Sequence, residues 1–177
     1  WDSLAELPPL KTEVREERAK SLVTRNDSPD IGFDRSINPY RGCEHGCVYC
    51  FARPGHAYVG LSPGLDFETR LFAKSNAAEA LERDLSAPGY TPRTIALGTA
   101  TDPYQPIERE RKLTRGVLEV LERTGHPVGI VTKSALVLRD VDILSRMAER
   151  GLVKVAISIT TLDRRLARAM EPRASTP

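Results

Sequence analysis

The chain has 177 residues, of which 40% are hydrophobic and 28% are charged, a balance that indicates one globular domain and argues against disorder. Its 26 basic and 24 acidic residues are spread along the sequence and give a formal net charge of +2, so charge alone supports no nucleic-acid or membrane-surface partner. No apolar run approaches the roughly 20 residues of a membrane span, and the start lacks a signal-peptide pattern, so we expect a cytoplasmic protein.

The first part of the chain differs from the rest. Residues 1–33 alternate charged residues and prolines, with too little apolar periodicity to form a core of their own. We therefore predict that residues 1–33 are an N-terminal leader that packs on the main domain, residues 34–177.

After the leader, strand and helix patterns alternate. Compact apolar runs predict strands at residues 36–38, 94–98, 128–132 and 152–160. Apolar side chains at spacings of three and four residues predict a helix after each strand, beginning at Asn76 (as N-cap), Leu113, Val141 and Leu162. Alternation of this kind is typical of a parallel sheet covered by helices, so we predict an α/β fold with an open or partial barrel.

The three cysteines all lie within eight residues, as Cys43, Cys47 and Cys50. An odd, clustered set is a poor disulfide framework, whereas three thiolates on one tight loop can each reach a different corner of a 4Fe–4S cluster and leave the fourth iron open. Gly46 would let the loop fold tightly, and we expect the shape of the loop to depend on its metal. A structural zinc site that adds His45, or a non-catalytic iron–sulfur module, remains an alternative.

The spacing C-x3-C-x2-C, with Tyr49 before the last cysteine, resembles the signature of radical S-adenosylmethionine enzymes. Residues 36–43, 98–106, 131–134 and 171–173 are similar to the branch related to spore photoproduct lyase, often labelled "DNA repair photolyase". This resemblance implies a (β/α) barrel of six units. About four are readable here, so we expect a partial barrel that is truncated at the C-terminus and can self-associate through its uncovered edge.

The resemblance also implies a function. The enzyme would use its 4Fe–4S cluster to cleave S-adenosylmethionine reductively to a 5′-deoxyadenosyl radical, which takes hydrogen from a substrate that the sequence does not identify. An external electron donor of the flavodoxin or ferredoxin type would supply the electron. Repair of a DNA lesion is an alternative reading, although the charge balance lends it no support.

Polar residues follow the predicted strands, where parallel α/β folds bind ligands. The resemblance suggests that the following residues contact the cofactor: Tyr49, Lys133, Ser158, and, after the second strand, Thr99, Thr101 and Asp102. For the residues at strand ends the alternative is a helix cap or a turn hydrogen bond. For Tyr49 the alternative is an aromatic ring packed in the core.

Three further residues receive simpler readings. Arg173 is expected to pair with Glu171 rather than with the cofactor. His56, close to the cysteine loop in sequence, is weighed as an active-site residue against a structural or solvated loop histidine, and the second reading is favoured. Glu108 is expected to begin a charged, solvated helix.

Overall fold

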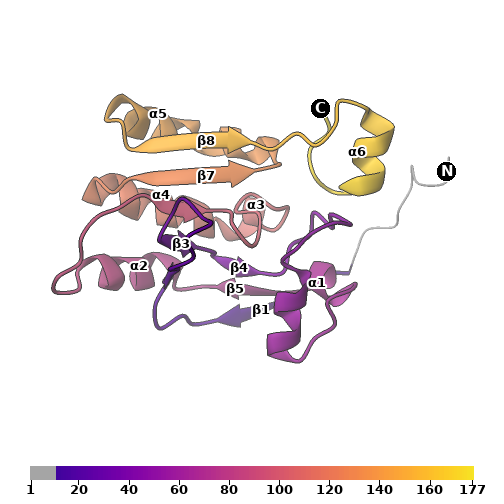
Figure 1. Ribbon diagram of the computed structural model, residues 1–177, viewed down its shortest axis with the longest axis horizontal. Coiled ribbons are helices and arrows are strands. Elements are labelled where there is room, and N and C mark those ends of the chain that lie inside the picture. Colours follow the sequence, from indigo (N-terminus) through magenta and orange to yellow (C-terminus); the bar gives the residue numbers. More distant parts are fainter. Residues whose placement is uncertain (1–10) are drawn as a thin grey trace.

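The larger of two sheets forms the centre of the structure, a computed structural model that describes residues 11–177 (Figure 1). Its strand order is β2-β3-β6-β7-β8, and the last four strands are parallel while β2 pairs antiparallel with β3. The strands span β2 Val23–Arg25, β3 Arg35–Ile37, β6 Ile95–Leu97, β7 Val128–Thr132 and β8 Val153–Ile157. The prediction of a parallel sheet in an α/β fold is confirmed, and no closed barrel is formed by the described strands.

The helices predicted from the apolar spacing are present, although several shorter elements lie between β3 and the first of them. The longer helices are α2 (Ala77–Leu85), α4 (Leu113–Thr124), α5 (Val141–Glu149) and α6 (Arg164–Met170). Shorter elements are α1 (Asp66–Thr69), α3 (Glu108–Arg111) and the 3-10 helices η2 (Arg53–Val59) and η3 (Ala135–Asp140). Figure 1 shows α6 and the C-terminus beyond the arrowheads of β7 and β8, at the carboxyl ends of the parallel strands.

The main hydrophobic core lies between the sheet and the helices α2, α4 and α5. Strand residues such as Ile37, Ile95 and Ile130 are buried in one cluster with helix residues such as Leu118 and Met147. Burying an aliphatic side chain of this size stabilises the fold by about 1.5–3 kcal/mol. The core thereby fixes the strand ends from which the site is built.

A second sheet was not predicted from the sequence. It has the order β1-β5-β4, with β1 at Glu13–Glu17, β5 at Arg70–Lys74 and β4 at Tyr40–Arg41. The sequence of β1, E-V-R-E-E, carries no apolar alternation, and it forms a strand because it pairs in parallel with β5. Pairing between distant segments therefore overrides local composition here.

The described part of the leader is bound to the main domain by side chains of the α2 region. Asp84 accepts hydrogen bonds from the backbone N–H of Leu22 (2.7 Å) and Val23 (2.9 Å). Asn76 lies at the predicted N-cap of α2, but its side chain bonds the backbone of Ala19 instead of capping the helix. Residues 1–10 of the predicted leader lie outside the described residues.

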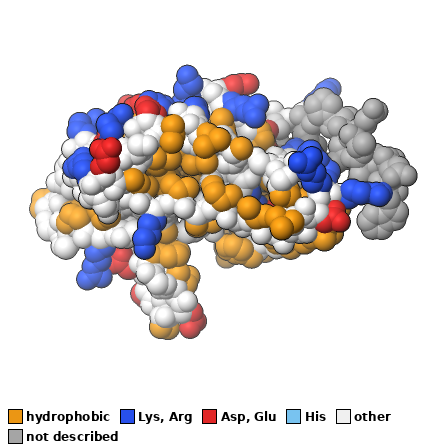
Figure 2. Space-filling view, turned by 90° about the horizontal axis from the view of Figure 1, so that it is seen from above, with side chains coloured by type: hydrophobic (Ala, Val, Ile, Leu, Met, Phe, Trp, Pro, Cys, Tyr) orange, Lys and Arg blue, Asp and Glu red, His pale blue; other side chains and the backbone are white. Residues whose placement is uncertain are grey.

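Among the described residues, no strand pairs with the far edge of the larger sheet. Strand β8 is its last strand, and Val155 (40%) and Ile157 (52%) are exposed, as are Ile159 (58%) and Leu162 (81%) beyond it. Figure 2, seen from the β8 side of Figure 1, shows hydrophobic side chains gathered in the middle of this face. None of the helices within residues 11–177 is both long and apolar enough to cross a membrane.

Candidate functional site

A single cavity at the carboxyl ends of the parallel strands contains every residue that the sequence singled out for a cofactor. The cysteine loop lines one side, and the segments after β6, β7 and β8 line the other. The predicted residues that line it are Cys43, Cys47, Tyr49, Cys50, Thr99, Thr101, Asp102, Lys133 and Ser158. The fold therefore brings together segments that are more than 100 residues apart in the chain.

The three thiols are free of disulfides, and Cys43 is buried while Cys47 and Cys50 are partly exposed. Burial raises the pKa of the Cys43 thiol far above its usual range, and the Asp102 carboxylate adds to this effect. Burial, followed by the Glu171 carboxylate, raises the pKa of Cys47 to about 11. Since only thiolates bind metals, loading of a metal centre would release these protons.

The chemistry of the donor set suits an iron–sulfur cluster, because three free thiols on one loop are the ligand type that such clusters use and each thiolate of a cubane binds a separate iron. Within residues 11–177, no group of three or more His, Cys, Asp or Glu side chains is arranged to hold a single metal ion. His45, the fourth ligand of the zinc alternative, has its Nδ1 3.3 Å from Asp102 Oδ2, without the alignment of a hydrogen bond.

Backbone and side-chain contacts give the cysteine loop a defined shape. Gly46 has a positive φ of 68°, as a tight turn requires, and the Cys43 N–H donates to Phe67 O at 2.9 Å. The buried amide of Gln105 accepts from Glu44 N–H (2.9 Å) and donates to Gly42 O (3.2 Å). Sequence reasoning gave Gln105 no role, because nothing in its spacing shows that it reaches back across 60 residues to this loop.

Asp102 joins the loop after β6 to the end of β7. Its carboxylate accepts hydrogen bonds from the Thr132 hydroxyl (2.7 Å) and from the backbone N–H of Lys133 (2.7 Å) and Tyr104 (2.9 Å). Burial alone would raise the pKa of Asp102, but its contact with His45 and these hydrogen bonds hold the pKa below its ordinary value. Asp102 is therefore an ionised residue of the cavity wall that also connects the loop after β6 to the end of β7.

Lys133 is the centre of a polar cluster on the opposite wall. Its Nζ lies 2.8 Å from Glu171 Oε1, 2.9 Å from Ser158 Oγ and 3.1 Å from Thr160 Oγ1. The Tyr49 hydroxyl joins the cluster through Thr160 (2.9 Å) and Glu171. Burial lowers the pKa of Lys133, but Glu171 and Tyr49 more than offset it and the net shift is upward. Lys133 is therefore a cation at the cavity wall.

The expected pair of Arg173 with Glu171 is wrong. Glu171 pairs with Lys133, and Arg173 pairs with Glu68 from α1. The segment after α6 crosses the cysteine loop, where Arg173 N–H donates to His45 O. The side chains of Glu171 and Arg173 therefore reach different partners. Tyr49 is 47% exposed, so it is not a plain core aromatic.

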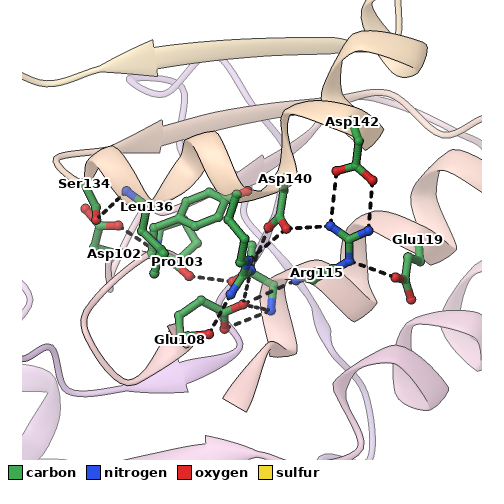
Figure 3. A network of polar contacts seen from close by, with 12 residues as sticks. Asp102, Pro103, Glu108, Arg115, Glu119, Ser134, Leu136, Asp140 and Asp142 are labelled. Atoms are coloured by element: carbon green, nitrogen blue, oxygen red, sulfur yellow. Dashed lines mark hydrogen bonds and ion pairs between the residues drawn. The ribbon is translucent and has the colours of Figure 1, made fainter. Parts of the chain in front are cut away.

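The expectation for Glu108 is also wrong, because this residue is fully buried. It accepts hydrogen bonds from Tyr40 Oη, Thr114 N–H (3.1 Å) and Arg139 Nη2 (2.7 Å). Figure 3 shows Glu108 in one polar network with Asp140 and Arg115. Asp140, also fully buried, pairs with Arg139 on the same network. These contacts tie α3, α4 and η3 together behind the cavity.

His56 has the structural role that was expected. Its ring is buried, Nε2 lies 2.9 Å from Arg70 O, and the ring packs edge-on against Phe67 with centroids 5.3 Å apart. It is not among the residues that line the cavity of the cysteine loop.

Comparison with known families agrees with this arrangement. Residues 37–177 match the radical SAM superfamily, and the chain belongs to that superfamily.

The chain is similar to an uncharacterized protein of Mycobacterium tuberculosis, Rv2578c, with 41% identity over 147 residues that cover 83% of this chain and 43% of that protein. It is also similar to uncharacterized proteins of Methanocaldococcus jannaschii (27% identity, 92% of this chain and 57% of that protein) and of Acidianus two-tailed virus (28% identity, 89% and 54%). The chain thus spans about half the length of the curated relatives it matches. No solved structure matches it.

Proposed function

We propose that this chain is the cofactor-binding part of a radical S-adenosylmethionine enzyme, in which Cys43, Cys47 and Cys50 hold a 4Fe–4S cluster. The observation that carries the proposal is that three free thiols and the polar residues after three parallel strands line one cavity. When bound, the cluster and S-adenosylmethionine would supply one-electron cleavage of the sulfonium and hydrogen-atom abstraction from the substrate.

The protein's own contribution on the cysteine side is to hold three thiolates apart on a rigid loop. Gln105 fixes the backbone on either side of Cys43, and Gly46 provides the turn between the first two cysteines. Burial of Cys43 keeps solvent from its sulfur, which protects a metal–thiolate bond from exchange with water.

On the opposite wall, Lys133 supplies the positive charge. Among the described residues that line the cavity it is the only Lys or Arg, so it is the natural partner for the carboxylate of an amino-acid ligand. Ser158 and Thr160 hold its ammonium group, and Glu171 neutralises it. We infer that the ligand carboxylate takes the place of Glu171 as one of the partners of Lys133.

The test is anaerobic reconstitution of the full-length protein with iron and sulfide. We expect about four iron and four sulfide per chain, as for one cubane, an electron paramagnetic resonance signal that changes on addition of S-adenosylmethionine, and formation of 5′-deoxyadenosine on reduction. Replacement of all three cysteines by Ala should abolish all of these, and His45→Ala should retain the cluster.

A single zinc ion bound with no sulfide, and lost in His45→Ala, would instead identify the zinc module. A cluster that forms but never supports cleavage of S-adenosylmethionine would identify a non-catalytic iron–sulfur module. A reductant of the flavodoxin or ferredoxin type is the partner we propose for the reaction, and it can replace dithionite in the same assay.

A further inference from the structure

Two arginines hold the cysteine loop from its outer side. Arg53, from η2, donates to the carbonyl oxygen of Cys47 through Nε (3.2 Å) and Nη2 (3.0 Å). Arg173, from the segment after α6, donates through Nε to the carbonyl oxygen of Glu44. The two guanidinium groups thus bind the carbonyl of Glu44, which lies between the first two cysteines of the motif, and the carbonyl of the second cysteine, Cys47.

Glu68, from α1, connects these two arginines. Its Oε1 lies 2.6 Å from Arg53 Nη2, and its Oε2 pairs with Arg173 Nη2. The three side chains are only 14–25% exposed, so this is a partly buried ionic triad rather than a solvated surface pair. Because Glu68 accepts from both guanidinium groups, it offsets their charge and fixes the direction from which each approaches the loop.

The turn at Gly46 fits against this triad. A Cβ added to Gly46 would overlap the Arg173 guanidinium and the Glu68 carboxylate, and the φ of 68° would itself be strained for another residue. The backbone supports the same contact, since Arg173 N–H donates to His45 O at 3.2 Å and Val48 N–H donates to Met170 O at 3.0 Å.

We propose that Arg53, Glu68 and Arg173 form a clamp that shapes the cysteine loop before any metal is bound, with Glu68 as the positioning residue. The clamp rests on the proposed function in one respect only, namely that the ligand of the cysteine loop is an iron–sulfur cluster. It is the alternative to the expectation that the loop depends on its metal for its shape, and the exchange measurement on metal-free protein decides between the two. A loop held in place by the polypeptide loses less conformational entropy when it binds, so the clamp should speed cluster assembly.

The test is amide hydrogen exchange of the metal-free, full-length protein, read by mass spectrometry over residues 44–48. Glu68→Gln keeps the size of the side chain and removes its charge. Glu122→Gln is the matched control, because Glu122 forms a two-bonded ion pair with Arg146 on the surface of α4 and α5. In Glu68→Gln we expect the amides of residues 44–48 to exchange about tenfold faster, or more, than in the unchanged protein, which is the effect of losing a hydrogen bond to a charged group. In the Glu122→Gln control we expect their exchange rates to be unchanged.

Equal exchange of this segment in the two variants would overturn the clamp. If circular dichroism shows that Glu68→Gln does not fold, Arg173→Lys takes its place. Lysine keeps the positive charge but lacks the planar guanidinium that donates to two acceptors at once, so residues 44–48 should also exchange faster in this variant. Unchanged exchange in a folded Arg173→Lys would overturn the proposal equally.

A second measurement connects the clamp to the site. At limiting iron, Glu68→Gln should take up its cluster several times more slowly than Glu122→Gln and reach the same final iron content. Equal uptake rates would contradict the positioning role. If the unchanged protein takes up no cluster at all, the proposed function fails, whereas the exchange comparison on metal-free protein still decides the clamp.

Discussion

Lys133 is the residue whose charge bears most directly on ligand binding. It lies at the end of β7, between the hydroxyls of Ser158 and Thr160, and its Nζ is 5.7 Å from the centre of the Tyr49 ring. Its side chain is only 17% exposed and its ammonium group is held by three partners, so in the proposed function little side-chain entropy would be lost when a ligand carboxylate replaces Glu171.

We predict that Lys133→Met weakens binding of S-adenosylmethionine by about tenfold or more, because Met keeps the aliphatic volume but loses a charge-assisted hydrogen bond. Binding is measured by titration of the cluster's resonance signal, and iron content should stay unchanged. Lys154→Met, at an exposed position of β8, is the control. Equal affinity in both variants would remove Lys133 from the binding site.

At the scale of secondary-structure elements, the cavity depends on how closely β6 and β7 approach each other. Gly98 ends β6 with a φ of 95°, and an added Cβ would collide with the carbonyl oxygen of Val131 in β7. Only glycine combines this conformation with so close a neighbour.

We predict that Gly98→Ala lowers the free energy of unfolding by about 2–3 kcal/mol, from backbone strain and the displacement of β7. Gly55→Ala is the control, because Gly55 has no atom within 4 Å of an added Cβ and no positive φ. Denaturant unfolding gives both values. If Gly98→Ala and Gly55→Ala have the same free energy of unfolding, then β6 and β7 can move apart at no cost in free energy and the prediction is wrong.

The buried network around Glu108 supports the elements behind the cavity. We predict that Glu108→Ala costs about 3–5 kcal/mol of unfolding free energy, because it removes one of the two buried carboxylates that pair with Arg139 and leaves the Tyr40 hydroxyl and the Thr114 N–H without their acceptor. Glu122→Ala, which breaks a surface pair with Arg146, should cost no more than about 1 kcal/mol. Similar losses in both proteins would mean that the network contributes no more than a surface ion pair.

At the scale of the whole molecule, the open sheet leaves the outer edge of β8 unpaired among residues 11–177, while its inner edge pairs with β7. Its exposed Val155 and Ile157 lie on a strand whose outer backbone groups have no partner strand among residues 11–177. Exposed edges with apolar side chains favour pairing with another chain.

We predict that the 177-residue chain self-associates at micromolar concentration through β8, and that Ile157→Lys reduces this association by placing a charge on the edge. Sedimentation velocity over a range of concentrations measures both. Arg25→Lys, on the opposite edge strand β2, should have no effect. A monomer at every concentration would contradict this prediction.

Local patterns in the sequence determined much of this protein. The spacing of three cysteines predicted a metal-binding loop, and the apolar periodicity predicted the four parallel strands and the longer helices, because both signals act over a few residues. The rule that ligands bind at the carboxyl ends of parallel strands pointed to the polar residues there, and the family resemblance selected Lys133 and Ser158 among them; both line the cavity of the cysteines.

Only the tertiary structure decided which charges are buried and which side chains meet. The strand β1, the burial of Glu108 and the pairing of Arg173 with Glu68 rather than Glu171 all depend on contacts between segments far apart in the chain. The sequence does not distinguish a charged residue that faces water from one that pairs with a residue more than 100 positions away. Tertiary packing, and not the spacing of residues along the chain, determines the partner. For that reason the sequence named the candidate ligands of the site, whereas the residues that hold those side chains in place became visible only in the folded chain.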